Sequence, residues 1–343
     1  MATLDDVARR AGVSTATASR IINGSSKPVS AALRDRVEAA VADLHYVPNA
    51  HARQLARSER TAVGVVVHDV SDPYFAEITR GLQRVATTDG RLVIICNTYR
   101  DPARELDYVE LLRAHQVAAM VLAGSGYHDA GFARALRGKL RAYELSGGRV
   151  AVIGRHDRAG DAVVPDNEAG GFLAGEHLYA LGHRDIGVIA GPRNLTTTTD
   201  RLTGLRRAAR AHGRPAPKVC YADFDRDSGA AATADLLAAH PRITAIAALN
   251  DSMAVGALAH LRGAGRRASV IGFDDMPIAR DVTPALTTIR LPLADMGALA
   301  MSLALSAPSP SPRVERVPAE LVERESTGPP DVSATGAPGT IGR

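Results

Sequence analysis

Apolar residues recur at helical spacing in the first part of the chain. The first stripe consists of Leu4, Val7, Ala8 and Ala11. Their i, i+3, i+4, i+7 spacing predicts a short helix, which Gly12 is expected to end. Ser14 is a favoured N-cap residue and predicts a second helix directly after a tight turn. A third helix over 31–44 would complete a small all-α unit within residues 1–47.

After residue 60, short β-branched apolar runs alternate with amphipathic segments. The expected strands are 63–67, 92–96, 120–122, 150–153, 186–189, 219–221, 245–249 and 270–273. The expected helices are 74–86, 102–115, 168–181, 200–212, 227–240 and 251–263. This alternation is typical of βαβ units with buried parallel strands. It predicts an α/β body of two doubly wound lobes, followed over 328–343 by a disordered tail of Gly, Pro, Ser, Thr and Ala.

Length and composition agree with several domains. The 343 residues exceed what one compact core usually holds. No apolar run approaches the roughly 18 residues that cross a bilayer, and the polar N-terminus does not resemble a signal peptide. We therefore expect a cytoplasmic protein that makes no contact with a membrane. Cys96 and Cys220 lie in strand-like runs, which indicates reduced thiols rather than a disulfide framework.

The positive charge of the chain is concentrated in its first sixth. Residues 1–60 contain nine Lys and Arg against six Asp and Glu, whereas the remainder contains 32 against 31. A basic head of this kind is what a small nucleic-acid-binding module requires.

The predicted second helix has one apolar and one polar face. Ala18, Ile21 and Ile22 would pack, whereas Thr15, Ala16, Ser19 and Arg20 would lie on the opposite arc. Two short helices joined by a tight turn form a helix-turn-helix, whose second helix enters the major groove of DNA. Arg20 could bind guanine bidentately, and Thr15 and Ser19 could contact a thymine methyl group or phosphates. The alternative is an ordinary solvated helix face.

Several motifs together resemble the lactose-repressor (LacI/GalR) family of bacterial transcriptional regulators. They are the runs 3–8, 12–14 and 17–23, and the later Tyr46-Val47-Pro48-Asn49. The resemblance extends from about Thr3 to Thr327, with Ala18 in place of the family's common valine. It implies a homodimer that binds a double-stranded operator. The DNA-contacting residues that it implies in the head are Thr3, Leu4, Ser14, Thr15, Ala16, Thr17, Ser19, Arg20 and Asn23.

The segment 48–60 is expected to form a linker with a short helix. Nine or so residues from Asn49 to Arg57 would be marginally stable as an isolated helix. The resemblance identifies this segment as a hinge helix in which Leu55 wedges into the minor groove of the operator. Asn49, Arg53 and Ala56 would contact DNA beside it. Alternatively, Leu55 packs on the body.

The resemblance also implies a body similar to a type I periplasmic sugar-binding protein. We expect its first lobe over about 61–158 and 291–327, and its second over about 159–290. Ligands of open α/β sheets bind beyond the carboxyl ends of the strands, where polar and aromatic residues of this chain gather. The expected effector-binding residues are Asp72, Tyr74, Phe75, Arg155, Thr197, Arg201, Phe224, Asn250 and Asp274. Carboxylates, amides, guanidinium groups and aromatic rings suit a polyhydroxylated ligand.

Alternatives remain at single positions of this cleft. Asp251 and Asp275 could serve the fold instead of the ligand, and Asp251 could do so as the N-cap of the helix that follows it. Tyr74 and Phe75 could belong to the hydrophobic core alone. The motif Asp72-Pro73-Tyr74-Phe75 stands where the family commonly has Asn-Pro-Phe-Phe, so the ligand class stays open.

No motif of the sequence favours an enzyme. It contains no Gly-x-Ser-x-Gly elbow, no phosphate-binding loop and no paired His or Cys motif, so neither catalysis nor a cofactor or metal is expected. The favoured function is a repressor that a sugar inducer releases from its operator. A transport binding protein, an activator, and a regulator co-repressed by a purine or a sugar phosphate are the alternatives. Some members of the family that the chain resembles tetramerise through a C-terminal leucine heptad. The tail after residue 327 contains no such heptad, so the resemblance implies a dimer.

Overall fold

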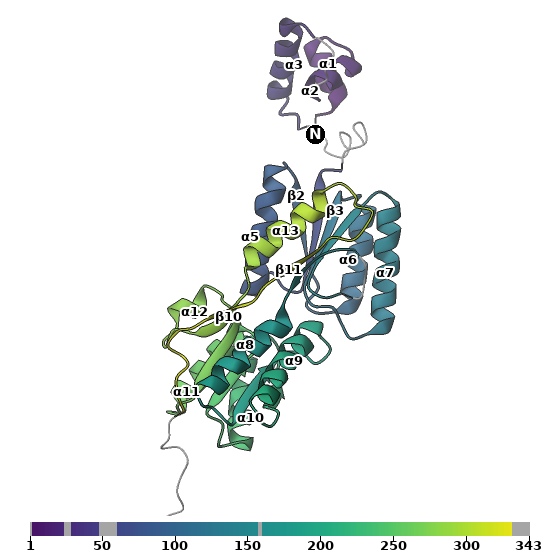
Figure 1. Cartoon of the computed structure of the whole chain (residues 1–343). Helices are drawn as coiled ribbons and strands as arrows, with labels where there is room; N and C mark the ends of the chain where they lie inside the picture. The colour runs from purple at the N-terminus through teal and green to yellow at the C-terminus, as the bar shows by residue number, and fades with distance from the viewer. Residues whose placement is uncertain (1, 24–28, 48–59, 157–159, 331–343) are drawn as a thin grey trace, which may run out of the picture. The chain divides into compact units, whose positions relative to one another are not determined.

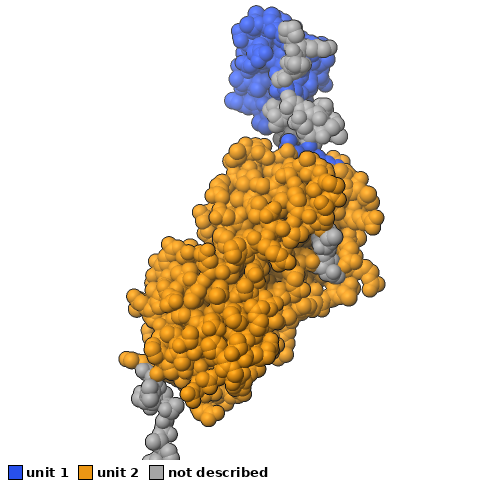
Figure 2. Space-filling model, viewed as in Figure 1, with its two compact units in different colours: residues 1–61 blue, residues 62–343 orange. Residues whose placement is uncertain are grey.

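The computed structural model describes residues 2–23, 29–47, 60–156 and 160–330. The chain forms two compact units, residues 1–61 and 62–343, which Figure 2 shows in blue and orange. Within the described residues, no helix is both long and apolar enough to span a membrane.

The first unit contains three helices, α1 (Leu4–Ala11), α2 (Thr15–Ile22) and α3 (Ala31–Asp43). Thr3 and Asp6 form a capping box at the start of α1, and Gly12 ends it with a positive φ of 64°. Ser14 caps α2 by accepting a hydrogen bond from the Thr17 amide. The small core consists of Val7, Ala8, Ala11, Ala18, Val37 and Ala40. The expected three-helix unit is confirmed.

The second unit contains two six-stranded sheets, each forming the centre of one lobe (Figure 1). The N-lobe strands are β1 (Ala62–Val67), β2 (Leu92–Asn97), β3 (Ala119–Ala123), β4 (Arg149–Ile153), β5 (Asp161–Pro165) and β11 (Val314–Val317). The order is β11-β5-β4-β3-β1-β2, with all neighbours parallel. The surrounding helices are α5 (Pro73–Thr88), α6 (Pro102–Ala114), α7 (Ala130–Leu145) and α13 (Leu293–Leu305).

The C-lobe repeats this architecture. Its strands are β6 (Ile186–Ala190), β7 (Lys218–Tyr221), β8 (Ala245–Ala248), β9 (Ser269–Asp274), β10 (Thr287–Arg290) and β12 (Glu320–Val322). The order is β12-β10-β9-β8-β6-β7, and only the β10–β12 pair is antiparallel. The helices are α8 (Asn167–Ala180), α9 (Thr196–Ala211), α10 (Arg226–Ala239), α11 (Asp251–Gly263) and the short α12 (Ile278–Asp281). The expected α/β fold with two doubly wound lobes is confirmed.

The lobe boundaries differ from the expected ones at two strands. We expected residues from 159 onward in the C-lobe, but β5 pairs with β4 and β11 and so belongs to the N-lobe sheet. Conversely, 320–322 lie in the C-lobe, because β12 pairs with β10 through Ile289 and Leu321. Within residues 160–330 the chain therefore passes between the lobes three times, after β5, after β10 and after β11.

Candidate functional site

The helix-turn-helix presents the polar face that the sequence predicts. Thr15, Ala16 and Arg20 are exposed on α2 and Ser19 is half-buried, whereas Ala18 is fully buried. The Thr15 hydroxyl donates a hydrogen bond of 2.8 Å to Asp5 Oδ1, which ties the start of α2 to α1. Arg36 of α3 donates to the carbonyls of Ala11 and Gly12 and holds the turn. The turn is therefore fixed from both sides, and the α2 face is free to meet DNA.

The other head residues expected at DNA surround this face. Thr3 and Leu4 begin α1, and the hydroxyls of Ser14 and Thr17 lie 2.8 Å apart at the start of α2. Asn23 Nδ2 donates to Ser19 Oγ at the other end of α2. The hinge residues Asn49, Arg53, Leu55 and Ala56 lie outside the described residues. Contact of all these residues with DNA stays a prediction.

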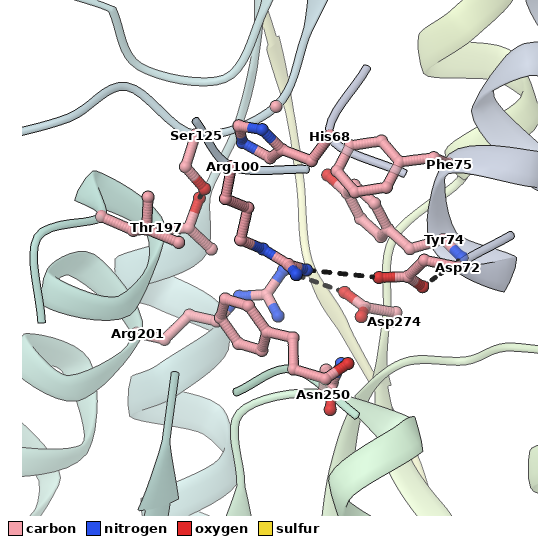
Figure 3. Close-up of a pocket in the computed structure, with 13 residues that line it drawn as sticks. His68, Asp72, Tyr74, Phe75, Arg100, Ser125, Thr197, Arg201, Asn250 and Asp274 are labelled. Carbon is pink, nitrogen blue, oxygen red and sulfur yellow. Dashed lines mark hydrogen bonds and ion pairs between the residues drawn. The ribbon is translucent and has the colours of Figure 1, made fainter. Parts of the chain in front are cut away.

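A pocket lies between the two lobes, at the carboxyl ends of their strands. The residues that line it are His68, Asp72, Tyr74, Phe75, Arg100, Gly124, Ser125, Leu195, Thr197, Arg201, Phe224, Asn250 and Asp274. Eight of the nine expected effector residues are in this set, the exception being Arg155. Figure 3 shows Asp72, Tyr74 and Asp274 on one side of the pocket, and Ser125 and Thr197 on the other.

Arg201 is the most heavily constrained side chain of the pocket. Its Nε donates to Asn167 Oδ1 (2.8 Å), its Nη1 to the Leu249 carbonyl (2.5 Å) and its Nη2 to Asp274 Oδ1 (2.9 Å). Its guanidinium carbon lies 3.7 Å from the centre of the Phe273 ring. These contacts come from α8, β9 and the loop after β8, so the C-lobe core fixes the orientation of the group.

The second guanidinium, of Arg100, faces the other carboxylate. Arg100 Nη2 lies 3.6 Å from Asp72 Oδ2, and the guanidinium lies 5.5 Å from the centre of the Phe224 ring. Asp72 is also the N-cap of α5, because its Oδ1 accepts from the Tyr74 amide at 3.0 Å. Each guanidinium of the pocket is thus paired with one carboxylate, and the formal charges of these four groups cancel.

Burial governs the ionisation of the pocket carboxyls. It raises the pKa of Asp274 to about 7, although the neighbouring Arg201 acts in the opposite direction. Burial also raises the pKa of Asp72, although the hydrogen bond from the Tyr74 amide and the positive charge of Arg100 both act to lower it. Both groups can therefore accept hydrogen bonds from ligand hydroxyls, and protonation of either would make it a donor as well.

Backbone strain marks the strand ends beside the pocket. Asp274 and Asp275 have φ values of 110° and 53°, and Tyr99 and Arg100 after β2 have 53° and 59°. Left-handed conformations of non-glycine residues are uncommon and gather at functional sites. At both strand ends they turn a charged side chain toward the pocket.

A set of hydrogen bonds joins the lobes at one end of the pocket. Ser125 Oγ donates to Thr197 Oγ1 over 2.7 Å, and the Thr196 amide donates to the Gly126 carbonyl over 2.9 Å. Tyr127 and Leu195 form an isolated antiparallel bridge in the same region. Ser125 and Thr197 therefore hold the two lobes together as well as lining the pocket.

Arg155, which we expected at the effector site, lies outside the pocket. Its guanidinium donates two hydrogen bonds, of 3.0 and 2.6 Å, to the carboxylate of Asp200. The side chain is 51% exposed and does not line the pocket. Asp200 lies on α9, in the other lobe, so the pair is an additional link between the lobes.

Several polar residues at or near the pocket make hydrogen bonds that stabilise the fold, and Asn250 is one of them. Asn250 lines the pocket, but its Oδ1 caps α11 and its Nδ2 donates to the Phe224 carbonyl. Asp251, expected as the cap, instead accepts hydrogen bonds from Thr288 Oγ1 (2.6 Å) and the Met276 amide (2.7 Å). Asp275 accepts from Arg290 and Arg324, which confirms its structural role. Tyr74 and Phe75 belong to the pocket lining and also contribute to the core.

Sequence reasoning missed five residues of the lining: His68, Arg100, Gly124, Ser125 and Leu195. His68 directly follows β1, a position that the strand-end argument covers. Arg100 and Ser125 follow β2 and β3 in the same way, so their position after a strand is the signal that indicates them.

Known proteins resemble both units. Residues 3–49 match the family model "Bacterial regulatory proteins, lacI family", and residues 176–327 match "Periplasmic binding protein-like domain". The HTH-type transcriptional regulator GalR of Escherichia coli (strain K12) is 36% identical over 346 residues, covering 98% of each chain. A crystal structure of the lac repressor dimer bound to operator and an anti-inducer covers 95% of this chain and 99% of its own, with 27% identity and a TM-score of 0.81. A CelR–cellobiose complex covers 95% and 100%, with 30% identity and a TM-score of 0.69.

Proposed function

The chain belongs to the lacI family of bacterial regulatory proteins, and we propose that it is a homodimeric repressor released from operator DNA by an uncharged sugar. The head supplies DNA recognition through the exposed face of α2. The operator of a two-fold dimer has two symmetry-related half-sites, so it is pseudo-palindromic. A bacterial regulator acts where the DNA is, which makes the cytoplasm its proposed location.

The charge pairing in the pocket is the observation that carries the choice of effector. Arg201 already binds Asp274, and Arg100 already faces Asp72. A phosphate or carboxylate ligand would need a cation that is not yet neutralised, and would bring its charge close to two carboxylates. A polyhydroxylated ligand can donate to the carboxylates and accept from the guanidinium groups without adding charge. The Phe224 ring provides an apolar surface for the C–H face of a sugar ring.

The similar structures support a sugar effector. The CelR relative was solved with cellobiose, which supports a sugar-responsive regulator here. The lac repressor was solved with an anti-inducer and operator, which supports a regulator that responds to a ligand while bound to DNA.

The proposed switch is a change in how the two lobes are held together. A ligand between them contacts Asp72 from the N-lobe and Arg201 from the C-lobe, and so alters the relation of the lobes. In a dimer this would change the spacing of the two hinge segments over 48–60. A coupling free energy of about 1 to 3 kcal/mol would change operator affinity roughly 5- to 150-fold.

Thermal-shift screening against sugars, sugar phosphates, nucleosides and purine bases tests this proposal, followed by DNA binding with each hit. A neutral sugar that raises Tm and weakens DNA binding is the expected result. A purine or sugar phosphate that raises Tm and tightens DNA binding would instead establish a co-repressed regulator. In a reporter assay, increased transcription on operator binding would identify an activator.

The proposed wedge at Leu55 has its own test. Leu55→Ala should weaken specific operator binding and reduce the bend of the bound DNA, because an inserted apolar side chain unstacks a base step. Gel mobility of circularly permuted operator fragments measures the bend. An unchanged bend would show that Leu55 does not insert.

A further inference from the structure

His68 lies at the inner wall of the pocket, between the effector pocket and a second, smaller cavity. The second cavity is lined by Glu105, Thr98 and His156 among others. His68 and Gly124 line both cavities. The His68 side chain is only 4% exposed, and Figure 3 shows its ring beside Phe75, on the wall that also carries Ser125. The imidazole ring therefore separates the two cavities.

The His68 ring is held in one orientation. It makes edge-to-face contacts with Phe75 and Tyr127, with centroid distances of 5.5 and 5.9 Å. Its Nδ1 lies 3.2 Å from Thr98 Oγ1. A Cβ atom at residue 124 would lie 2.7 Å from His68 Nε2, so the ring fits only because this residue is glycine. The chain positions the imidazole from three sides.

One nitrogen of this fixed ring has no well-formed hydrogen bond. Within the described residues, no group meets ordinary hydrogen-bond geometry with the buried His68 Nε2, although the Ser125 backbone lies near enough to the ring to act weakly on its pKa, in the raising direction. Burial, followed by the charge of Arg100, lowers the pKa of His68 to about 3, so the ring is neutral near pH 7. An unpaired buried polar group destabilises the protein, and a ligand that pairs with it recovers that loss.

The tautomeric state of a neutral imidazole determines which ligand groups can hydrogen-bond to Nε2. Either Nδ1 carries the proton and Nε2 accepts, or Thr98 donates to Nδ1 and Nε2 donates. A hydroxyl can donate and accept, so it fits both tautomers. A phosphate or carboxylate oxygen fits only one of them.

We propose that His68 determines effector specificity by hydrogen-bonding, through Nε2, to one hydroxyl of the bound sugar. This inference rests on the proposed function, because it assumes that a sugar occupies the pocket. A site built to pair with one hydroxyl discriminates strongly against an analogue that lacks it, since the buried partner is then left unpaired. His68 therefore discriminates between sugars that differ in the hydroxyl at one position of the ring.

The test uses the full-length dimer and three proteins: wild type, His68→Phe and His115→Phe. Phenylalanine preserves the ring that closes the pocket but removes both nitrogens. His115 lies in the same lobe, is exposed and does not line the pocket, so His115→Phe controls for a histidine-to-phenylalanine exchange. D-Galactose, D-glucose and D-ribose are screened by thermal shift, and calorimetry then measures the best sugar and each of its monodeoxy analogues.

In wild type and His115→Phe, removal of one particular hydroxyl should weaken binding about 10-fold or more. In His68→Phe, the parent sugar should bind about as weakly as that deoxy analogue, and removal of the same hydroxyl should change affinity less than about twofold. If His68→Phe binds the sugar as wild type does, or if every deoxy analogue loses the same factor in both proteins, the inference is wrong. If none of the sugars binds wild type, the proposed function fails and removes the premise of this inference.

Thermal unfolding and DNA binding together distinguish a specific effect from misfolding. His68→Phe should show a cooperative thermal transition of the body and should bind operator without sugar as wild type does, because operator binding by the proposed dimer requires a folded body. A His68→Gln variant, which retains a polar group at this wall, should recover part of the affinity for the sugar. Sugar binding by His68→Gln as weak as that of His68→Phe, in a protein that still binds DNA, would contradict the proposed hydrogen bond.

Discussion

Arg201 Nη2 donates a hydrogen bond to Asp274 Oδ1 over 2.9 Å, and both side chains are only 2% exposed. The pair joins α9 to the end of β9, inside the C-lobe. Arg201 therefore has two roles, because it lines the pocket and also neutralises a buried carboxylate. A change at Arg201 should alter both stability and ligand binding.

Arg201→Ala should lower the free energy of unfolding by about 3 to 5 kcal/mol, because it leaves the buried Asp274 carboxylate without its partner. Arg155→Ala breaks the exposed pair with Asp200 and should cost about 1 kcal/mol or less. Urea denaturation of the two variants measures the contrast. Equal losses would show that burial does not set the strength of these pairs.

Arg201→Ala should also abolish the sugar response while the folded protein still binds DNA. The measurement is made at a temperature where the variant is folded by circular dichroism. A sugar that still releases this variant from DNA would remove Arg201 from the proposed binding site.

Glu105 should make stability depend on pH. It is buried on α6, and burial raises its pKa to about 7, above the ordinary value near 4.5. The folded state therefore binds the proton more tightly, so this stabilisation is complete below about pH 4.5 and is lost as pH rises through 7. Glu105→Gln, an analogue of the protonated acid, should be more stable than wild type at pH 8 by at most about 3 kcal/mol.

The two proteins should converge in stability near pH 5, where the wild-type acid is protonated. Asp107→Asn removes an exposed carboxylate from the same helix and provides the matched control. Chemical denaturation at pH 5, 6, 7 and 8 measures how the free energy of unfolding of each protein changes with pH. An identical pH dependence in Glu105→Gln and wild type would contradict the raised pKa.

Arg20 should be the major base-reading side chain of the head. It is exposed on α2, and the described part of the chain offers it no hydrogen bond or ion pair. Arg20→Ala should weaken binding to a specific operator by about 1 to 3 kcal/mol and relax the choice of one base. Arg9→Ala, at an exposed arginine of α1, should affect specific and random DNA alike. Equal effects of the two variants on specificity would exclude Arg20 as a base reader.

Close packing of α8 on α9 should be indispensable for the pocket. A Cβ at residue 171 would lie 2.0 Å from the backbone oxygen of Arg201, so Gly171→Ala must push the two helices apart. We expect a loss of about 1 to 3 kcal/mol and weaker sugar binding. Gly138→Ala, in α7 with nothing near the added atom, should instead stabilise by about 0.5 to 1 kcal/mol. Tm measurements that rank the variants in the reverse order would contradict this packing argument.

The fold follows from sequence where local signals are strong. Gly12 and Ser14 end one helix and begin the next, as their residue types indicate. Buried parallel strands such as β3 and β9 are continuous apolar runs that can be recognised without their partners. Helices α7 and α13 and strand β5, which lies between β4 and β11, were not predicted. β5 is short and ends in Pro165, and only its pairing with β4 and β11 places it in the first lobe.

The pocket could be predicted only in part, because contacts between residues far apart in the sequence decide which side chains enter it. Strand ends locate residues at the correct edge of a sheet, and this argument placed Asp72, Arg201 and Asp274 correctly. It says nothing about side-chain direction, and Arg155 turns away to pair with Asp200. The role of His68 depends on Gly124 and Thr98, which lie far from it in the sequence and meet it only in the folded sheet.

The most direct test of the account is a titration of sugar into a preformed protein–operator complex. A duplex selected from a random pool by the protein itself serves as operator, and fluorescence anisotropy follows its release. The account predicts that the neutral sugar with the largest thermal shift lowers operator affinity by about 5- to 150-fold. A sugar that stabilises the protein but leaves operator affinity unchanged, or increases it, would contradict the proposal of an induced repressor.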